Sequence, residues 1–198
     1  MSKRLNVFWF ELLMCILVSS LVRSANVDYA TYTNPQLGIE FSYPKSWRNT
    51  PLMANNGRDV AEFDGEFDKS RRAPSRITLG LALNLKNSDL VEYISGYCDT
   101  FHGKISAVSK GEIRAVLCAD TCPNGGHDYY FMRSGTKSPV FVFWLSGEAV
   151  SLEDHLLSSI HFIGPDGSPI PKNYPDYGAM FPSRNSPTAI ELRKLLGM

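Results

Sequence analysis

The chain has 198 residues, of which 43% are hydrophobic and 20% are charged, and its 20 basic and 20 acidic residues give zero net charge. This length fits one domain that can bury a sizeable core and does not require disulfides for stability. The chain has no basic stripe with interleaved aromatic residues, which excludes a typical nucleic-acid-binding protein, because phosphate contacts need clustered Lys and Arg.

The N-terminus has the three-part layout of a secretory signal peptide. Lys3 and Arg4 precede a mostly apolar run over residues 5–22, and small residues follow at Ser24 and beyond. We therefore expect cleavage after Ser24 and export to the periplasm or the exterior, with membrane contact only through this segment. An uncleaved anchor is the alternative, because the run approaches the roughly 20 residues that span a bilayer; Glu11 opposes it, since a carboxylate is costly at the centre of a membrane.

The segment Tyr32–Trp47, YTNPQLGIEFSYPKSW, predicts a turn followed by a strand. Asn34 and Pro35 are typical turn residues. Residues 39–43 then alternate apolar and polar side chains, which predicts a strand with one buried face. Trp47 lies just after the end of this strand and is positioned to fold back over the same face.

Residues 49–59 and 64–75 have loop-like composition, rich in Asn, Gly, Arg, Asp and Pro, with a short strand possible at 60–63. Residues 76–85 form the clearest strand, because every second residue from Ile77 onward is Ile or Leu. The alternate face is small or polar, so we expect a sheet with one face on a core and one face open or lightly covered. An antiparallel sheet allows that asymmetry, whereas a doubly wound parallel sheet does not.

A helix is predicted from Ser88 and Asp89 to Phe101, because the apolar residues fall at helical spacing and acidic residues occupy the first turn. This helix should lie on the sheet. Four strands are expected after it, at 105–108, 112–118, 127–133 and 139–146. Their short links imply an antiparallel meander. The last strand is apolar on both faces, which places it centrally in the sheet.

A second covering helix is predicted from Ser151 to Ile160, with a capping-box spacing between Ser151 and Asp154. Six prolines then fall between positions 165 and 187, which favours an extended tail, with only 188–196 able to form a helix. The tail either wraps on the domain or binds something else. The expected organisation is a leader at 1–24, a domain at 25–163 and a Pro-rich tail at 164–198.

Five motifs in this order resemble the PsbP-like superfamily over about residues 30–163: YTNPQLGIEFSYPKSW, RITLGLALNL, SDLVEYISGYCDTF, PVFVFWLSG and LEDHLLSSIHFI. The resemblance implies an α+β fold with an antiparallel β-sheet flanked by helices. Members include extrinsic subunits of the photosynthetic oxygen-evolving complex, a nuclear Ran-binding protein and bacterial exported proteins, which bind or assemble without chemistry. The cysteines and the Pro-rich tail depart from the family pattern, so no member's partner transfers to this chain.

Three cysteines follow the leader: Cys98, Cys118 and Cys122. An odd number in an exported chain predicts one disulfide and one free thiol. We expect Cys118 to pair with Cys122, because they lie on either side of a hairpin turn. Cys98 is the alternative partner of Cys118, if that strand packs beneath the helix, and only short Cα distances allow either bond. The remaining thiol should be buried and inert.

Cys118, Asp120, Cys122, His127 and Asp128 lie within 11 residues and raise the possibility of a metal site. The spacing matches no common structural zinc pattern, so we expect no metal and no cofactor. Cys122 with His127 would be a weak signal for a nucleophile and its base. The alternative to a binding protein is therefore a metal-binding or thiol-dependent protein centred on Cys118, Cys122 and His127.

The function expected from the sequence is an exported, non-enzymatic binding or assembly factor with a protein partner or a small ligand. Its binding surface should be the less apolar face of the sheet together with the loops at 49–59 and 64–75, since loops on a rigid scaffold usually carry recognition. Six aromatic residues are assigned to the core rather than to a groove: Trp47, Tyr129, Tyr130, Phe141, Phe143 and Trp144.

Overall fold

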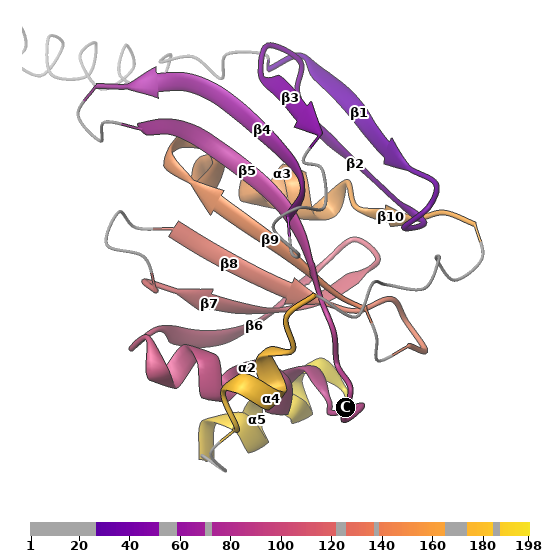
Figure 1. Ribbon diagram of the computed structural model, residues 1–198, viewed down its shortest axis with the longest axis vertical. Helices are drawn as coiled ribbons and strands as arrows, with labels where there is room; N and C mark the ends of the chain where they lie inside the picture. The colour runs from indigo at the N-terminus through magenta and orange to yellow at the C-terminus, as the bar shows by residue number, and fades with distance from the viewer. Residues whose placement is uncertain are drawn as a thin grey trace, which may run out of the picture.

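The computed structural model describes residues 27–51, 59–69, 73–121, 126–136, 139–164, 174–183 and 187–198. It has the expected α+β architecture, in which a large antiparallel sheet lies between a small sheet on one side and helices on the other (Figure 1). The expected leader at 1–24 lies outside the described residues. None of the helices in the described ranges combines the length and the hydropathy of a membrane span.

The large sheet has seven strands in the order β3-β4-β5-β9-β8-β7-β6, and each neighbouring pair is antiparallel. Its strands are β3 Arg48–Pro51, β4 Asp59–Asp68, β5 Ala73–Ala82, β6 Lys104–Lys110, β7 Ile113–Ala119, β8 Gly126–Phe131 and β9 Val140–Ser146. The last four strands form the predicted meander. The apolar strand β9 occupies the central position in the sheet, as predicted.

A single sheet was expected, and this expectation is wrong. β1 (Tyr29–Asn34), β2 (Ile39–Pro44) and β10 (His161–Phe162) form a separate three-stranded sheet in the order β1-β2-β10. The alternation in β2 buries Phe41, whose ring lies 4.7 Å from that of Phe143 on β9. The apolar face of β2 is therefore buried against the other sheet rather than added to its edge.

The segments 49–59 and 64–75 were expected to be loops, but most of their described residues belong to β3, β4 and β5. Glu62 and Asp64 lie on one face of β4, while the neighbouring Ala61 and Phe63 are fully buried on the other. Arg76 on β5 neutralises the polar face of β4, with its guanidinium 2.8 Å from Asp64. Cross-strand ion pairs of this kind let a polar sequence form a strand.

The large sheet has a hydrophobic core on each face. The first core, between the two sheets, includes Leu79, Tyr129 and Phe143. The second core lies under the helices and includes Val116 and Val142. The face that the sequence indicated as open or lightly covered is thus covered by helices over part of its area.

Helix α2 (Leu90–Thr100) forms where the periodicity predicted it. Its N-cap is Asp89, whose carboxylate accepts a hydrogen bond from the backbone N–H of Glu92 at 2.8 Å. Such a cap satisfies one of the free N–H groups at a helix start. The helix buries one side, including Val91, Ile94 and Cys98, against the sheet.

The predicted helix at 151–160 is shorter and begins differently. A 3₁₀ helix, η2, covers Gly147–Leu152, and α3 covers only Glu153–Ser158, without a side-chain N-cap. The Ser151 hydroxyl donates to the carbonyl of Glu148 at 2.7 Å, so the predicted capping box does not form. Ser and Thr readily make such local bonds in place of caps.

The described part of the Pro-rich tail packs on the domain. It contains α4 (Tyr177–Met180) and α5 (Pro187–Leu196), and Tyr177 and Leu192 are buried in the core under the helices. Tyr93 of α2 fixes this layer, because its hydroxyl donates to the carbonyl of Leu83 at 2.6 Å and accepts from the N–H of Tyr177 at 2.9 Å. The Tyr93 side chain is fully buried.

We predict that Tyr93→Phe lowers the free energy of unfolding by about 2 kcal/mol, because it leaves a buried carbonyl and a buried N–H without their partner. Urea unfolding followed by circular dichroism measures this loss. Tyr32→Phe is the matched control, since the Tyr32 hydroxyl accepts one bond, from Asn34 at 3.1 Å, in a partly exposed site. The control should change stability by no more than about 0.5 kcal/mol; equal losses in the two variants would contradict the role of Tyr93.

Candidate functional site

The disulfide joins Cys118 to Cys98 and not to Cys122, so the preferred pairing from the sequence is corrected. The two sulfur atoms are 2.15 Å apart and the two Cα atoms are 5.7 Å apart, while Cys122 lies outside the described residues. The reason is the packing of α2 across the meander, which brings the buried side of the helix onto the side chain of Cys118 in β7. The bond ties the helix to the sheet.

Gly103, just after α2, allows the chain to pass close to this disulfide. A Cβ atom at this position would lie 2.7 Å from the Cys118 sulfur and 2.8 Å from the Cys98 sulfur. Real Cβ contacts are not this short, so a larger residue would displace the disulfide or the chain. Both cysteines are almost fully buried, which makes the bond structural rather than reactive.

The described residues of the possible metal site, which exclude Cys122, do not form one cluster. Cys118 pairs in register with Asp128, and their side chains lie on the helix side of the sheet, whereas His127 pairs with Ala119 and points to the opposite face. Asp120 instead forms an ion pair with Lys104 at 2.9 Å. Across the ranges that the structure describes, no group of three His, Cys, Asp or Glu side chains could hold a metal ion.

His127 binds Glu153, a partner that the sequence did not indicate. Its Nδ1 atom lies 2.6 Å from Oε2 of Glu153, and the Tyr129 hydroxyl donates to the same oxygen at 2.5 Å. Two residues of β8 thus hold the first residue of α3. Burial raises the pKa of Tyr129, and its bond to the Glu153 carboxylate raises it further, so the phenol stays a proton donor. The missed signal was the i, i+2 spacing of 127 and 129 on one strand face.

The helix-side face of the large sheet extends beyond the strands on which helix α2 packs. We call this part the open face, and it consists of Glu62, Asp64, Arg76, Thr78, Trp144 and Ser146, of which Thr78 is buried and the other five are partly buried. Register places these residues in two rows across β4, β5 and β9, with Glu62, Thr78 and Trp144 in one row. Helix α2 packs on β6, β7 and β8 instead.

A charged network occupies one end of the open face. Arg76 reaches Glu62 at 2.9 Å and Asp64 at 2.8 Å, and Arg48 on β3 lies 3.3 Å from Asp64. The side chain of Arg76 remains 40% exposed, whereas that of Asp64 is only 11% exposed. The partly exposed guanidinium of Arg76 is therefore held in place by the carboxylates of Glu62 and Asp64.

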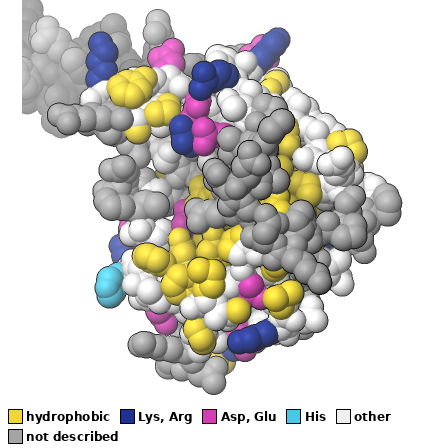
Figure 2. All heavy atoms as spheres, viewed as in Figure 1, with side chains coloured by type: hydrophobic (Ala, Val, Ile, Leu, Met, Phe, Trp, Pro, Cys, Tyr) yellow, Lys and Arg dark blue, Asp and Glu magenta, His cyan; other side chains and the backbone are white. Residues whose placement is uncertain are grey.

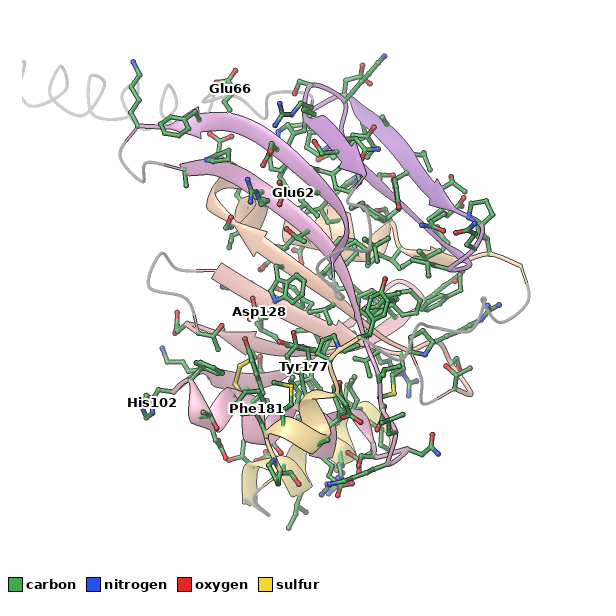
Figure 3. The ribbon with its side chains drawn as sticks, viewed as in Figure 1. Glu62, Glu66, His102, Asp128, Tyr177 and Phe181 are labelled. Atoms are coloured by element: carbon green, nitrogen blue, oxygen red, sulfur yellow. A yellow bond between two sulfur atoms is a disulfide. The ribbon has the colours of Figure 1, made fainter. Side chains whose placement is uncertain are left out.

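Trp144 and the buried Asp128 continue the row towards the helices. Trp144 is partly buried, and Asp128 accepts a hydrogen bond from the Thr121 hydroxyl at 3.0 Å. Figure 3 shows Glu62, Asp128 and Tyr177 in succession from β4 down to α4. The open face is thus continuous with the layer of helices.

An aromatic cluster borders the open face at the helices. The ring of Tyr97 lies 5.2 Å from that of Tyr177 and 5.4 Å from that of Phe181, and Phe101 is 44% exposed at its rim. Figure 2 shows a group of hydrophobic side chains in the lower half of this view, over the position of α2 and α4, with charged side chains both above and below it. A polar, ion-paired zone and an apolar zone therefore share one side of the molecule.

No protein-family model matches the chain, and no curated protein matches its sequence. Among solved structures, it is similar to cyanobacterial PsbP (CyanoP) from Synechocystis sp. PCC 6803, at 14% identity and a TM-score of 0.48 over 72% of this chain and 99% of that chain. It is also similar to a protein from Bacteroides thetaiotaomicron VPI-5482, at 9% identity and a TM-score of 0.44 over 68% of this chain and 48% of that chain. The first is a PsbP, the family that the sequence motifs resemble, and both likenesses concern the fold.

We predict that peptide mapping without reductant finds Cys98 linked to Cys118. Reduction of this bond, which closes a loop with a sequence separation of 20, should lower the free energy of unfolding by about 3 kcal/mol. Urea unfolding with and without reductant measures this loss. The Cys122→Ser variant should show the same loss of unfolding free energy on reduction as the wild type. Linkage between Cys118 and Cys122, or loss of the reductant effect in Cys122→Ser, would contradict the pairing.

We predict that three of the nine tyrosines resist ionisation in the folded protein: Tyr93, Tyr129 and Tyr130. Burial is the largest cause that raises each pKa. A pKa raised by folding stabilises the protein fully below the unfolded tyrosine pKa of about 10, and this contribution is lost as the pH rises above that value. Phenolate absorbance in an alkaline titration should show these three ionising only with unfolding. Ionisation of all nine near pH 10, with the fold retained, would refute this.

Proposed function

We propose that this chain is an exported, non-enzymatic binding or assembly factor that holds a protein partner on the open face. The observation that carries the proposal is the open face itself: a partly buried Trp144 beside an arginine fixed by two carboxylates, all on rigid strands. Tryptophan and arginine are the residues most enriched among energetic hot spots of protein interfaces.

Export is supported by two independent features. The buried Cys98–Cys118 disulfide belongs to an oxidising compartment, because disulfides persist in exported proteins and are rare in the reducing cytosol. The N-terminal residues 1–24 have the composition of a secretory leader. We infer a periplasmic or extracellular location from both together.

A role without catalysis is supported by how the reactive residue types are used. Cys118 is held in a disulfide, and His127 and Tyr129 both bond to Glu153 at the start of α3. A nucleophile needs an adjacent base within hydrogen-bond reach. Cys118 and His127, the two described members of the alternative thiol or metal site, are on opposite faces of the sheet and do not meet that requirement.

The open face also has the organisation expected of an interface. The Arg76 network gives orientation through charge, and the neighbouring aromatic cluster with the exposed Phe101 and Met180 supplies apolar area. Interfaces typically combine an apolar or aromatic centre with a polar rim. A protein surface with an exposed carboxylate and an apolar contact fits this face best, because a carboxylate can bind the exposed guanidinium.

We predict that Arg76→Ala weakens binding to the co-purifying partner at least tenfold, because hot-spot arginines cost about 2 kcal/mol or more when truncated. The partner is first identified by mass spectrometry of proteins that co-purify with the wild type, and its affinity is then measured by calorimetry. Lys194→Ala on the exposed side of α5 is the matched control and should bind as the wild type does.

Urea unfolding of both variants checks that the fold is intact. The proposal requires Arg76→Ala to lose affinity while it still unfolds cooperatively. Equal affinity in Arg76→Ala, Lys194→Ala and wild type would overturn the assignment of the open face, and turnover of a substrate by the purified protein would overturn the non-enzymatic role.

A further inference from the structure

The outer strand of the small sheet, β1, has a free backbone edge on the surface. In the order β1-β2-β10 it pairs only with β2 among the described residues, and Figure 1 shows it at the outer margin of the molecule. This edge belongs to the small sheet, whereas the open face belongs to the large one. The two surfaces are therefore separate, and a partner on one does not require a partner on the other.

The hydrogen-bond pattern shows which groups of β1 point outward. The N–H of Lys45 donates to the carbonyl of Asp28 at 2.8 Å, and in an antiparallel ladder every second pair is bonded in this way. Ala30, Tyr32 and Asn34 therefore bond to β2, and the alternate residues do not. The N–H of Ser42, opposite Thr31, confirms the pattern, because it turns away from β1 and donates to the Ser159 hydroxyl at 2.9 Å.

The outward groups therefore belong to Tyr29, Thr31 and Thr33. Each presents one donor and one acceptor along the edge. The side chains of Thr31 and Thr33 are exposed. Only another extended strand can satisfy such a regular row of backbone groups, which is how edge strands recruit partners.

The edge strand β6 of the large sheet is protected, whereas no described residue pairs with the outer edge of β1. The edge strand β6 begins with Lys104 and ends with Lys110, and α5 packs beside it. Lysines and covering helices are the usual means by which proteins block edge-to-edge pairing. β1, with the sequence YATYTN, has no charge, no Pro and no Gly, and its Tyr and Thr residues favour strands.

We propose that β1 pairs antiparallel with β1 of a second copy of this chain and joins two small sheets into one six-stranded sheet. Thr31 lies on the two-fold axis opposite itself, and Tyr29 lies opposite Thr33. This is the register in which every outward group from Tyr29 to Thr33 finds a partner. The contact uses the same patch on both copies, as a closed two-fold dimer requires.

The side chains of β1 are self-complementary in this register. On the inner face, the small Ala30 lies opposite the large Tyr32, and both are partly exposed in the single chain. On the outer face, Thr31 meets Thr31, and Thr–Thr pairs stabilise antiparallel sheets. Asp28 already forms an ion pair with Lys45 at 3.3 Å and faces Asn34 of the second copy, so no like charges oppose each other.

The introduction of a charge at Thr31, the residue on the two-fold axis, tests this dimer. The protein is expressed from its full sequence, purified as the cell leaves it, and diluted serially in sedimentation velocity. Wild type should form a concentration-dependent dimer. Thr31→Glu and Thr31→Lys should each weaken it about fivefold, because like charges then lie directly opposite. Thr31→Gln, which matches Glu in shape without the charge, should dimerise within about twofold of wild type.

An equal mixture of Thr31→Glu and Thr31→Lys should restore the dimer as a mixed species, because opposite charges then face each other; native mass spectrometry identifies it. Amide hydrogen exchange provides a second readout at the edge itself. Exchange of the Thr31 and Thr33 amides should become slower as the protein concentration rises. The exchange rates of the Ala30 and Tyr32 amides, which already bond to β2, should not change.

Three results would overturn the proposal. Wild type that stays monomeric at every dilution would show that a second copy does not occupy the edge. A dimer unaffected by Thr31→Glu and Thr31→Lys would place the contact elsewhere on the surface. A mixture of the two charged variants that dimerises no better than either alone would exclude Thr31 from the two-fold axis.

Discussion

The register between β5 and β9 is the constraint on which both layers of this protein depend. Leu79 pairs with Phe143, and both side chains are fully buried between the two sheets; one residue earlier on β5, Thr78 pairs with Trp144 on the opposite face. Because side chains alternate along a strand, a slip of one residue would exchange the core face and the helix face over the whole strand. The same register therefore determines which residues form the core, which contact the helices and which form the open face.

The open face lies beyond the strands on which helix α2 packs. Helix α2 covers β6 to β8, where the alternate residues are Val116, Cys118 and Tyr130, and the Cys98–Cys118 disulfide and the Tyr93 hydroxyl hold it there. The row that contains Cys118 continues across the sheet through Asp128, Trp144, Thr78 and Glu62. Asp128 and Thr78 of this row are buried, whereas Trp144 and Glu62 are partly exposed.

Several residues of types that carry chemistry in other proteins make contacts between elements here. His127, Tyr129 and Glu153 connect β8 to α3, and Cys118 anchors α2. The sequence brought Cys118 and His127 within ten positions of each other, but β7 and β8 present them on opposite faces. Residues that are close in sequence across a hairpin therefore need not have neighbouring side chains, because side chains alternate between the two faces of a sheet along each strand.

The sequence by itself determined the features that depend on local periodicity. The alternation in 39–43 and from Ile77 onward gave strands, and the helical spacing after Asp89 gave α2, since each pattern has one buried side. Tertiary structure alone decided which cysteine pairs with Cys118, that β2 belongs to a separate sheet, and that polar segments near Glu62 form strands. These outcomes depend on contacts between residues far apart in the chain, and local patterns carry no information about such contacts.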